Sequence, residues 1–149
     1  MNRFVPFHPS HLEAFSPDPA MPVAMEEIRA ADIAALANGY AWTMFRDGAA
    51  VACGGLLPVW AGRAVAWSLL SPAMGPHAFL AADRQVRRVL AQARADGFRR
   101  IEATVDPRHP GGRGLRWALS LGFAPEGLMK HWTRDGRHMW LVAITGEIE

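Results

Sequence analysis

Apolar and polar positions alternate along most of the chain, and the period of the alternation changes from one segment to the next. From Val23 to Leu36 the apolar side chains recur at helical spacing, which predicts an amphipathic helix that ends at Asn38-Gly39. Prolines interrupt the pattern before this helix, where only Arg3 to Phe7 has the length and composition of a short edge strand.

The next segment predicts three strands. Tyr40 to Phe45 alternates and is rich in aromatic residues, and Asp47-Gly48 after it is a strong two-residue hairpin signal. The apolar run from Ala50 to Val59 and the segment from Ala64 to Leu70 follow, with a glycine-containing turn between them. Gly54-Gly55 inside the middle strand predicts a bulge or the close approach of another backbone.

After Ser71-Pro72 the period lengthens to that of a helix. The apolar side chains from Phe79 to Ala93 form one stripe, and Gly97 stands where the C-cap of that helix is expected. A strand-like alternation then extends from Ile101 to Val105 and stops at Asp106-Pro107.

The last part of the chain predicts a short helix and a final hairpin. The helix extends from about Arg113 to Leu121, and Gly122 ends it. Strands are expected near Phe123 to Thr133 and Arg137 to Ile144, with Asp135-Gly136 between them as a type I′ turn signal.

The succession of strand, long helix and strand sets the fold class. It implies two parallel strands with a right-handed connection, while the hairpins on either side are antiparallel. A chain of 149 residues has the size of one ordinary domain. We therefore expect a single α/β (α+β) domain over residues 1–149, with a mixed, mostly antiparallel sheet built around a parallel strand-helix-strand core.

This order of elements, together with one short phrase, resembles the GNAT superfamily of N-acetyltransferases. The phrase is Leu121-Gly122-Phe123 followed by Glu126-Gly127, which is typical of the last helix and the next strand in that family. The resemblance covers about two-thirds of the chain, from Ala50 to Ile144. It implies the GNAT fold with helices on both faces of the sheet, and an N-acetyltransferase that uses acetyl-CoA and an amine acceptor.

The coenzyme loop of that family has the form Arg/Gln-x-x-Gly-x-Gly/Ala and holds a pyrophosphate on backbone N–H groups at a helix N-terminus. The corresponding segment here, Ser71 to Ala78, has one glycine, Gly75. Pro76 after it has no N–H to donate. The loop is therefore degenerate as a phosphate nest.

Candidate coenzyme-binding residues come from the strand end, the loop, the first helical turn and a glycine-rich turn: Leu70, Ser71, Gly75, His77 and Arg113. The alternative for His77 is an exposed first-turn side chain without a ligand. For Arg113 the alternative is that its neighbouring glycines only shape the turn into the short helix.

Two catalytic features that are common in the family are replaced. The family often has a tyrosine four residues before the glycine of Leu-Gly-Phe, where it acts as general acid to the coenzyme thiolate; this chain has Ala118. Trp117 beside it has no acidic proton suitable for that role. The family also often has an asparagine after the preceding strand, and none lies between Val105 and Gly122.

Glu102 is the best candidate for the general base that would take a proton from an incoming amine, because it is a carboxylate on the strand beside the expected cleft. The alternative is a solvated or ion-paired strand carboxylate. No metal is assigned, because His109 and His131 are isolated from other ligand types at recognised spacing.

The two ends of the chain carry a narrower resemblance. Phe7 to Pro17 and Trp132 to Arg137, with an aromatic residue five positions before Gly122, look like GNAT-like small proteins of T7-like tailed phages, including internal virion (core) proteins. This implies a phage or prophage origin. It also implies an alternative function, a non-catalytic virion or assembly protein that contacts phage structural proteins or itself.

Composition narrows the classes of function and of location that remain. A net charge of +2 is too small to imply nucleic-acid binding, and the arginines from Arg84 to Arg100 are typical of a solvated helix face, with phosphate contact as the alternative. The single cysteine, Cys53, excludes an internal disulfide framework. With no signal peptide and no apolar run of membrane-spanning length, the protein is expected in the cytoplasm or packaged in a phage particle.

Overall fold

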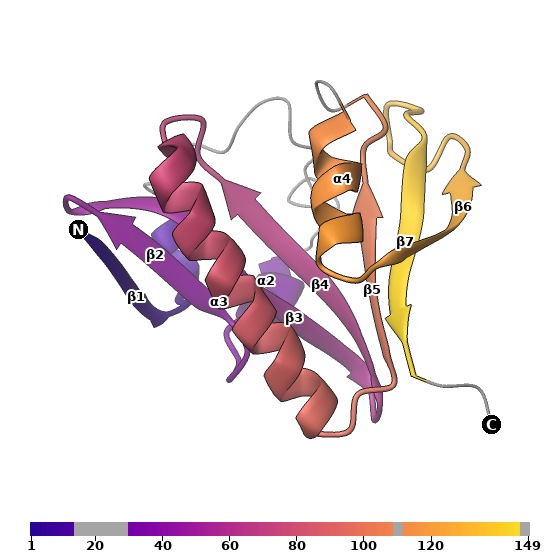
Figure 1. Ribbon diagram of the computed structural model, residues 1–149, viewed down its shortest axis with the longest axis horizontal. Coiled ribbons are helices and arrows are strands. Elements are labelled where there is room, and N and C mark those ends of the chain that lie inside the picture. Colours follow the sequence, from indigo (N-terminus) through magenta and orange to yellow (C-terminus); the bar gives the residue numbers. More distant parts are fainter. Residues whose placement is uncertain (14–29, 109–111, 147–149) are drawn as a thin grey trace.

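The computed structural model describes residues 1–13, 30–108 and 112–146, whose strands form a seven-stranded sheet in the order β1-β2-β3-β4-β5-β7-β6 (Figure 1). The strands are β1 (Asn2–Pro6), β2 (Trp42–Arg46), β3 (Ala49–Trp60), β4 (Arg63–Leu70), β5 (Arg100–Val105), β6 (Ala124–Met129) and β7 (Met139–Thr145). Only β4 and β5 pair in parallel, and the other neighbours in the sheet are antiparallel. The predicted mixed sheet with a parallel core is confirmed.

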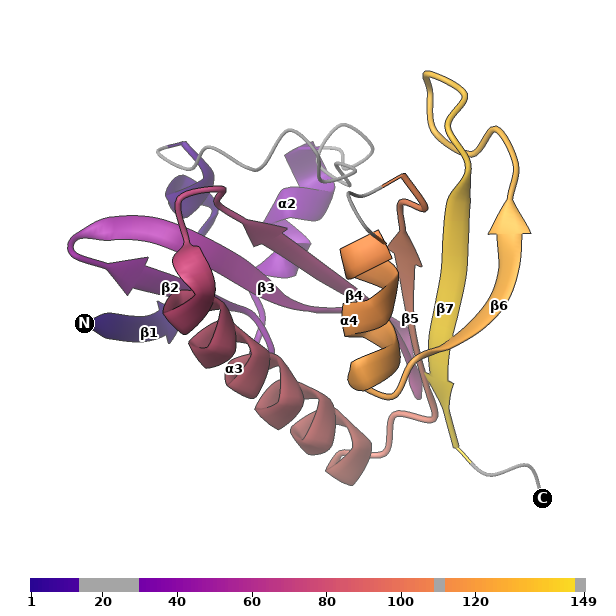
Figure 2. The same cartoon turned by 45° about the horizontal axis from the view of Figure 1, so that its top comes forward.

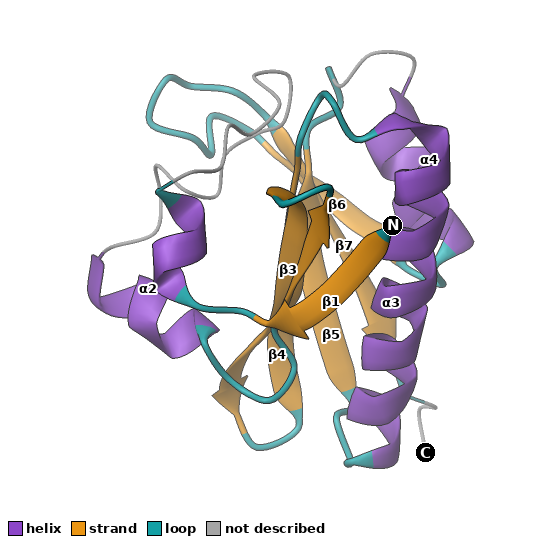
Figure 3. Ribbon diagram, turned by 90° about the vertical axis from the view of Figure 1, so that its left-hand side faces the viewer, coloured by secondary structure: helices purple, strands orange, loops and turns teal. Residues whose placement is uncertain are grey.

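Helices cover both faces of the sheet. Helices α3 (Gly75–Ala95) and α4 (Arg113–Ser120) lie on one face and α2 (Ala30–Leu36) on the other (Figure 3). The helix predicted from Val23 is present from Ala30, and its first half lies outside the described residues. A short 3-10 helix, η1 (Pro9–Leu12), follows β1. No helix in the described part of the chain is long and apolar enough to span a membrane.

Alternation along β4 and β5 divides the core into two layers. Ala64 of β4 and Ile101 of β5 are buried together with residues of α3 and α4. On the opposite face Leu69 of β4 is buried with Leu36 of α2, and Trp67 packs against that cluster. Because side chains alternate along a strand, Glu102 lies on the α2 face of β5.

The two predicted hairpin turns have different outcomes. Asp47 and Gly48 have φ of 52° and 83°, the left-handed values that a type I′ turn requires, so the β2–β3 hairpin is confirmed. The type I′ turn predicted at Asp135-Gly136 is wrong, because Gly136 has a φ of 82° but Asp135 is not left-handed. The flanking strands stop at Met129 and start again only at Met139.

Hydrogen bonds to Thr133 explain that second turn. Thr133 accepts the backbone N–H of Gly136 through its carbonyl at 2.9 Å and that of Arg137 through its hydroxyl at 2.8 Å. These contacts fold residues 130–138 into a loop of its own, where the sequence predicted that the strand ladder would continue.

The paired glycines of β3 allow a close approach of neighbouring chain, as predicted. A Cβ atom added at Gly55 would lie 2.7 Å from the Cα of Ala41, and one at Gly54 would lie 2.9 Å from the carbonyl oxygen of Trp67. Any side chain at these positions would force the neighbouring strands apart.

Candidate functional site

The parallel strands β4 and β5 form the starting point of the candidate site because they stay paired over only part of their length. Their register extends from Arg63 opposite Arg100 to Val65 opposite Glu102. Beyond it the two strands diverge toward their C-terminal ends (Figures 1 and 2). A cleft of about 1420 Å³ opens there, bounded by both strands, the start of α3 and one side of α4.

Most of the predicted site residues meet in this cleft. Leu70, Ser71 and Gly75 line it from the end of β4 and the start of α3, Arg113 lines it from α4, and Glu102 lines it from β5. The side chain of His77 is exposed and lies outside the lining. The roles assigned to these residues stay predictions.

Backbone hydrogen bonds, one of them to β3, hold the loop from β4 into α3. The N–H of Ser71 donates to the carbonyl of Val51 at 2.8 Å, and the N–H of Met74 donates to the carbonyl of Ser71 at 3.1 Å. Helix α3 then starts at Gly75, which has a φ of 73° and open space where a Cβ would lie.

The start of α3 fits an anionic group. The first N–H groups of a helix have no intrahelical partner, and they lie at the positive end of the helix dipole. Gly75 therefore presents a backbone donor at the cleft and His77 presents one outside its lining, while Pro76 presents none. The residues present fit the coenzyme pyrophosphate, with fewer donors than a loop of several glycines.

The position where the family often has its tyrosine acid lies in the cleft and carries no proton donor. Ala118 lines the cleft and is 7% exposed. The indole N–H of Trp117 donates to Asp83 of α3 at 2.8 Å, so it fastens α4 to α3. The only tyrosine of the sequence, Tyr40, donates its hydroxyl to Asp96 at 2.6 Å, and this hydrogen bond raises the pKa of Tyr40.

Glu102 lies between two arginines. Its carboxylate accepts from the guanidinium of Arg63 at 2.5 Å and from Nε of Arg100 at 2.7 Å. Burial alone would raise the pKa of Glu102, but the two guanidinium hydrogen bonds outweigh it and hold the pKa below its ordinary value. The carboxylate is therefore ionised and ion-paired at neutral pH.

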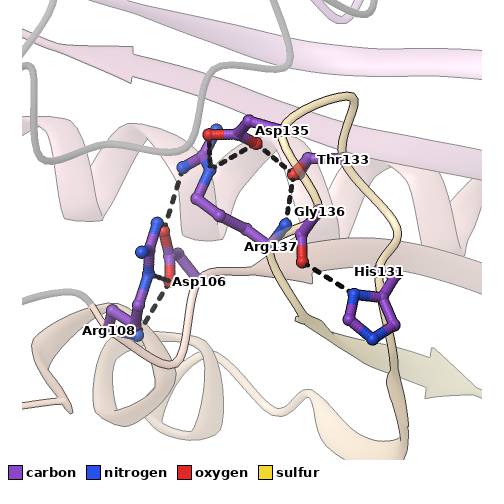
Figure 4. A network of polar contacts seen from close by, with 7 residues as sticks. All are labelled: Asp106, Arg108, His131, Thr133, Asp135, Gly136 and Arg137. Carbon is purple, nitrogen blue, oxygen red and sulfur yellow. Dashed lines mark hydrogen bonds and ion pairs between the residues drawn. The ribbon is translucent and has the colours of Figure 1, made fainter.

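A second buried carboxylate, which the sequence analysis treated only as a strand stop, lies at the end of β5. Asp106 is 4% exposed, accepts the backbone N–H of Arg108 at 2.8 Å and forms an ion pair with Arg137 at 3.2 Å (Figure 4). Arg137 also contacts Asp135, whose carboxylate accepts the hydroxyl of Thr133. This network ties the β6–β7 loop to the end of β5, and it brings Trp132 to the cleft.

Comparison with known proteins gives a fold and no closer relative. No protein-family model matches the sequence, and no curated protein matches it by sequence. Solved structures do match along nearly the whole chain, among them an N-acetyltransferase and an acetyltransferase of the GNAT family. Their identities are below 25%, so the likeness establishes the GNAT acetyltransferase fold.

Three of these structures represent the likeness. Ard1 from Thermoplasma volcanium has a TM-score of 0.75 at 12% identity, and the match covers 99% of each chain. The ribosomal-protein-S18-alanine N-acetyltransferase from Escherichia coli has a TM-score of 0.71 at 14% identity, over 100% of this chain and 96% of that one. A GNAT family acetyltransferase from Elizabethkingia anophelis with acetyl-CoA bound has a TM-score of 0.66 at 12% identity, over 97% and 98%.

Proposed function

We propose that the protein is an acyl-coenzyme A-dependent N-acetyltransferase with a degenerate coenzyme loop. The observation that carries the proposal is the cleft that opens where β4 and β5 separate, next to the N-terminus of α3. A cleft at the carboxyl ends of parallel strands is a common ligand site in open α/β sheets. The fold shared with acetyltransferases, one of them with acetyl-CoA bound, supports the same activity.

Acetyl-CoA supplies an acetyl group activated as a thioester when it is bound. The backbone N–H groups of Gly75 and His77, at the positive end of α3, would hold its pyrophosphate. Arg113 adds a positive charge on the α4 side, and Leu70 with Ser71 lines the path into the cleft. The protein's part is to bind and orient the two reactants.

Glu102 is the proposed general base, and its surroundings limit that role. A proton on Glu102 would break its charge-assisted hydrogen bonds to Arg63 and Arg100, and its lowered pKa makes it a weak base. We therefore expect Glu102 to take a proton from the amine only after one arginine has moved. Turnover should be slow for an N-acetyltransferase.

Titration with acetyl-CoA tests the proposal. A ligand at about 100 times its Kd stabilises the native state by about 2.7 kcal/mol, so the midpoint of thermal unfolding should rise by several degrees. Arg113→Ala should reduce the rise, whereas Arg116→Ala on the same helix should not, because Arg116 is outside the cleft lining. No shift at millimolar acetyl-CoA would rule out the enzyme.

A second candidate function is a non-catalytic virion or assembly protein of phage or prophage origin. Two observations favour it. Ala118 stands where a proton donor is expected, and the indole N–H of Trp117 beside it is used in a hydrogen bond between α4 and α3. This candidate predicts no acetyl-CoA binding, a gene among capsid and tail genes, and the protein itself in purified virions by mass spectrometry. An acetyl-CoA-dependent activity would rule it out.

A further inference from the structure

The part of the cleft that faces α2 is lined by charged and aromatic side chains. Alternation along the strands places Arg63 and Trp67 of β4, and Glu102 and Asp106 of β5, on this face. Trp132 of the β6–β7 loop also lines the cleft and is 43% exposed. An acceptor that approaches from the α2 side would meet these five side chains.

No carboxylate among the described lining residues is available to an ammonium group. The acids in the lining are Glu102, which is held by Arg63 and Arg100, and Asp106, which is held by Arg137. A polycation would therefore have to displace an arginine from a well-buried carboxylate. This wall disfavours an acceptor that carries several positive charges.

The same side of the cleft, on the α2 face of the sheet, also has hydrogen-bond donors without an acceptor among the described residues. The indole N–H of Trp67 and the Nε–H of Arg63 are buried, and neither has a hydrogen-bond partner among the residues that the structure describes. Buried donors without partners are rare in proteins and point to a missing acceptor atom. Trp67 and Trp132 add aromatic surface on which an apolar group can pack.

We propose that the acceptor is an amine that also carries a carboxylate or carbonyl oxygen and an apolar or aromatic side chain, as in a free amino acid or the first residue of a peptide. The oxygen accepts from the indole N–H of Trp67, and the side chain packs on Trp132. The inference rests on the proposed N-acetyltransferase function and names its substrate class.

The transfer itself is balanced. The amine nitrogen forms the new amide bond and loses a proton, while the carbon–sulfur bond of the thioester breaks. The sulfur leaves with the bonding electron pair and is released as the free thiol after taking up a proton.

Four amines separate the possibilities: L-phenylalanine, a tripeptide that begins with phenylalanine, phenethylamine and spermidine. Binding is measured by calorimetry, and acetylation is measured by release of free thiol from acetyl-CoA. Cys53 adds little background to the thiol reading, because it is 1% exposed and burial raises its pKa to about 12. Phenylalanine or the tripeptide should exceed phenethylamine about tenfold in kcat/KM, which is the worth of one good hydrogen bond. Whichever of the two is preferred identifies the source of the amine.

Two matched variants locate the contact. Trp67→Phe keeps an aromatic ring and removes the N–H, so it should raise KM for phenylalanine about tenfold and leave kcat and phenethylamine acetylation nearly unchanged. Trp140→Phe makes the same change on the opposite face of the sheet, outside the cleft lining, and should alter neither. Equal effects of the two substitutions would overturn the assignment of Trp67.

The outcomes also separate this inference from the proposed function. Binding of acetyl-CoA together with a preference for spermidine, or with equal use of phenethylamine and phenylalanine, would overturn the acceptor class and leave the enzyme intact. Binding of phenylalanine without any binding of acetyl-CoA would overturn the proposed enzyme and leave the predicted ligand class intact. Failure of all four amines to bind would overturn the inference.

Discussion

The two faces of β5 differ sharply although their residues alternate along one short strand. Ile101 and Ala103 pack with residues of α3 and α4 in an apolar layer. Glu102, between them in sequence, is held by Arg63 and Arg100 on the face of α2. One face of the strand therefore supports the fold, and the other forms a charged wall of the cleft. Substitutions on the two faces should accordingly have different consequences.

The largest effect is expected on the apolar face. Ile101 is 1% exposed, and Ile101→Ala removes buried methylene and methyl groups and leaves a cavity among residues that cannot fully collapse. We expect a loss of about 2–4 kcal/mol in the free energy of unfolding, measured by urea denaturation.

Leu128→Ala on β6 is the matched control, because the leucine is 40% exposed and its loss should cost within about 0.5 kcal/mol. Equal losses at the two positions would contradict the burial of Ile101 in the apolar layer.

Most of the fold could be predicted from the sequence because its elements have clear local signals. The period-two runs of β2 to β5 and the apolar stripe of α3 sit where the alternation placed them. The exception is the loop before β7. There the Thr133 hydroxyl accepts the backbone N–H of Arg137, and the Arg137 guanidinium donates to Asp106 at the end of β5. The pattern Asp135-Gly136 gives no sign of either contact.

The candidate site was predictable only in part. Glu102 and Gly75 could be found because the local sequence pattern alone indicates a carboxylate on a strand and a glycine at the start of a helix. The role of Asp106 depends on Arg137, which is far away in sequence. That the indole N–H of Trp67 finds no partner in the described part of the chain is a property of packing alone. Partners of this kind appear only when the strands are brought together.

An intermediate effect is expected on the charged face. Glu102→Gln removes the charge that both arginines share, and the free energy of unfolding at pH 7 should fall by about 1–2 kcal/mol, because the carboxylate is mostly buried and the arginines are partly hydrated. Glu13→Gln makes the same change at an exposed site and should cost within about 0.5 kcal/mol.

The pH dependence of the free energy of unfolding gives a second test of the ion pairs of Glu102. Its pKa is lower in the folded protein than in the unfolded chain, so its contribution to stability is complete above the ordinary value of 4.5 and is lost as pH falls through the lowered folded-state pKa. Urea denaturation at several pH values should show that Glu102→Gln weakens the fall in stability across this acidic range. An unchanged slope would contradict the ion pairs.

The smallest effect is expected at one of the hydrogen bonds between the two helices on the apolar face, the one that Trp117 of α4 donates to Asp83 of α3. Trp117 donates to Asp83, which also accepts from Nε of Arg87 at 2.9 Å. Burial alone would raise the pKa of Asp83, but these two hydrogen bonds hold it below its ordinary value. Trp117→Phe keeps the aromatic packing and removes one donor, so the free energy of unfolding should fall by about 1 kcal/mol and the pKa of Asp83 should rise. A double-mutant cycle with Asp83→Asn isolates the contact, and a coupling energy near zero would mean that this hydrogen bond does not help to dock α4 on α3.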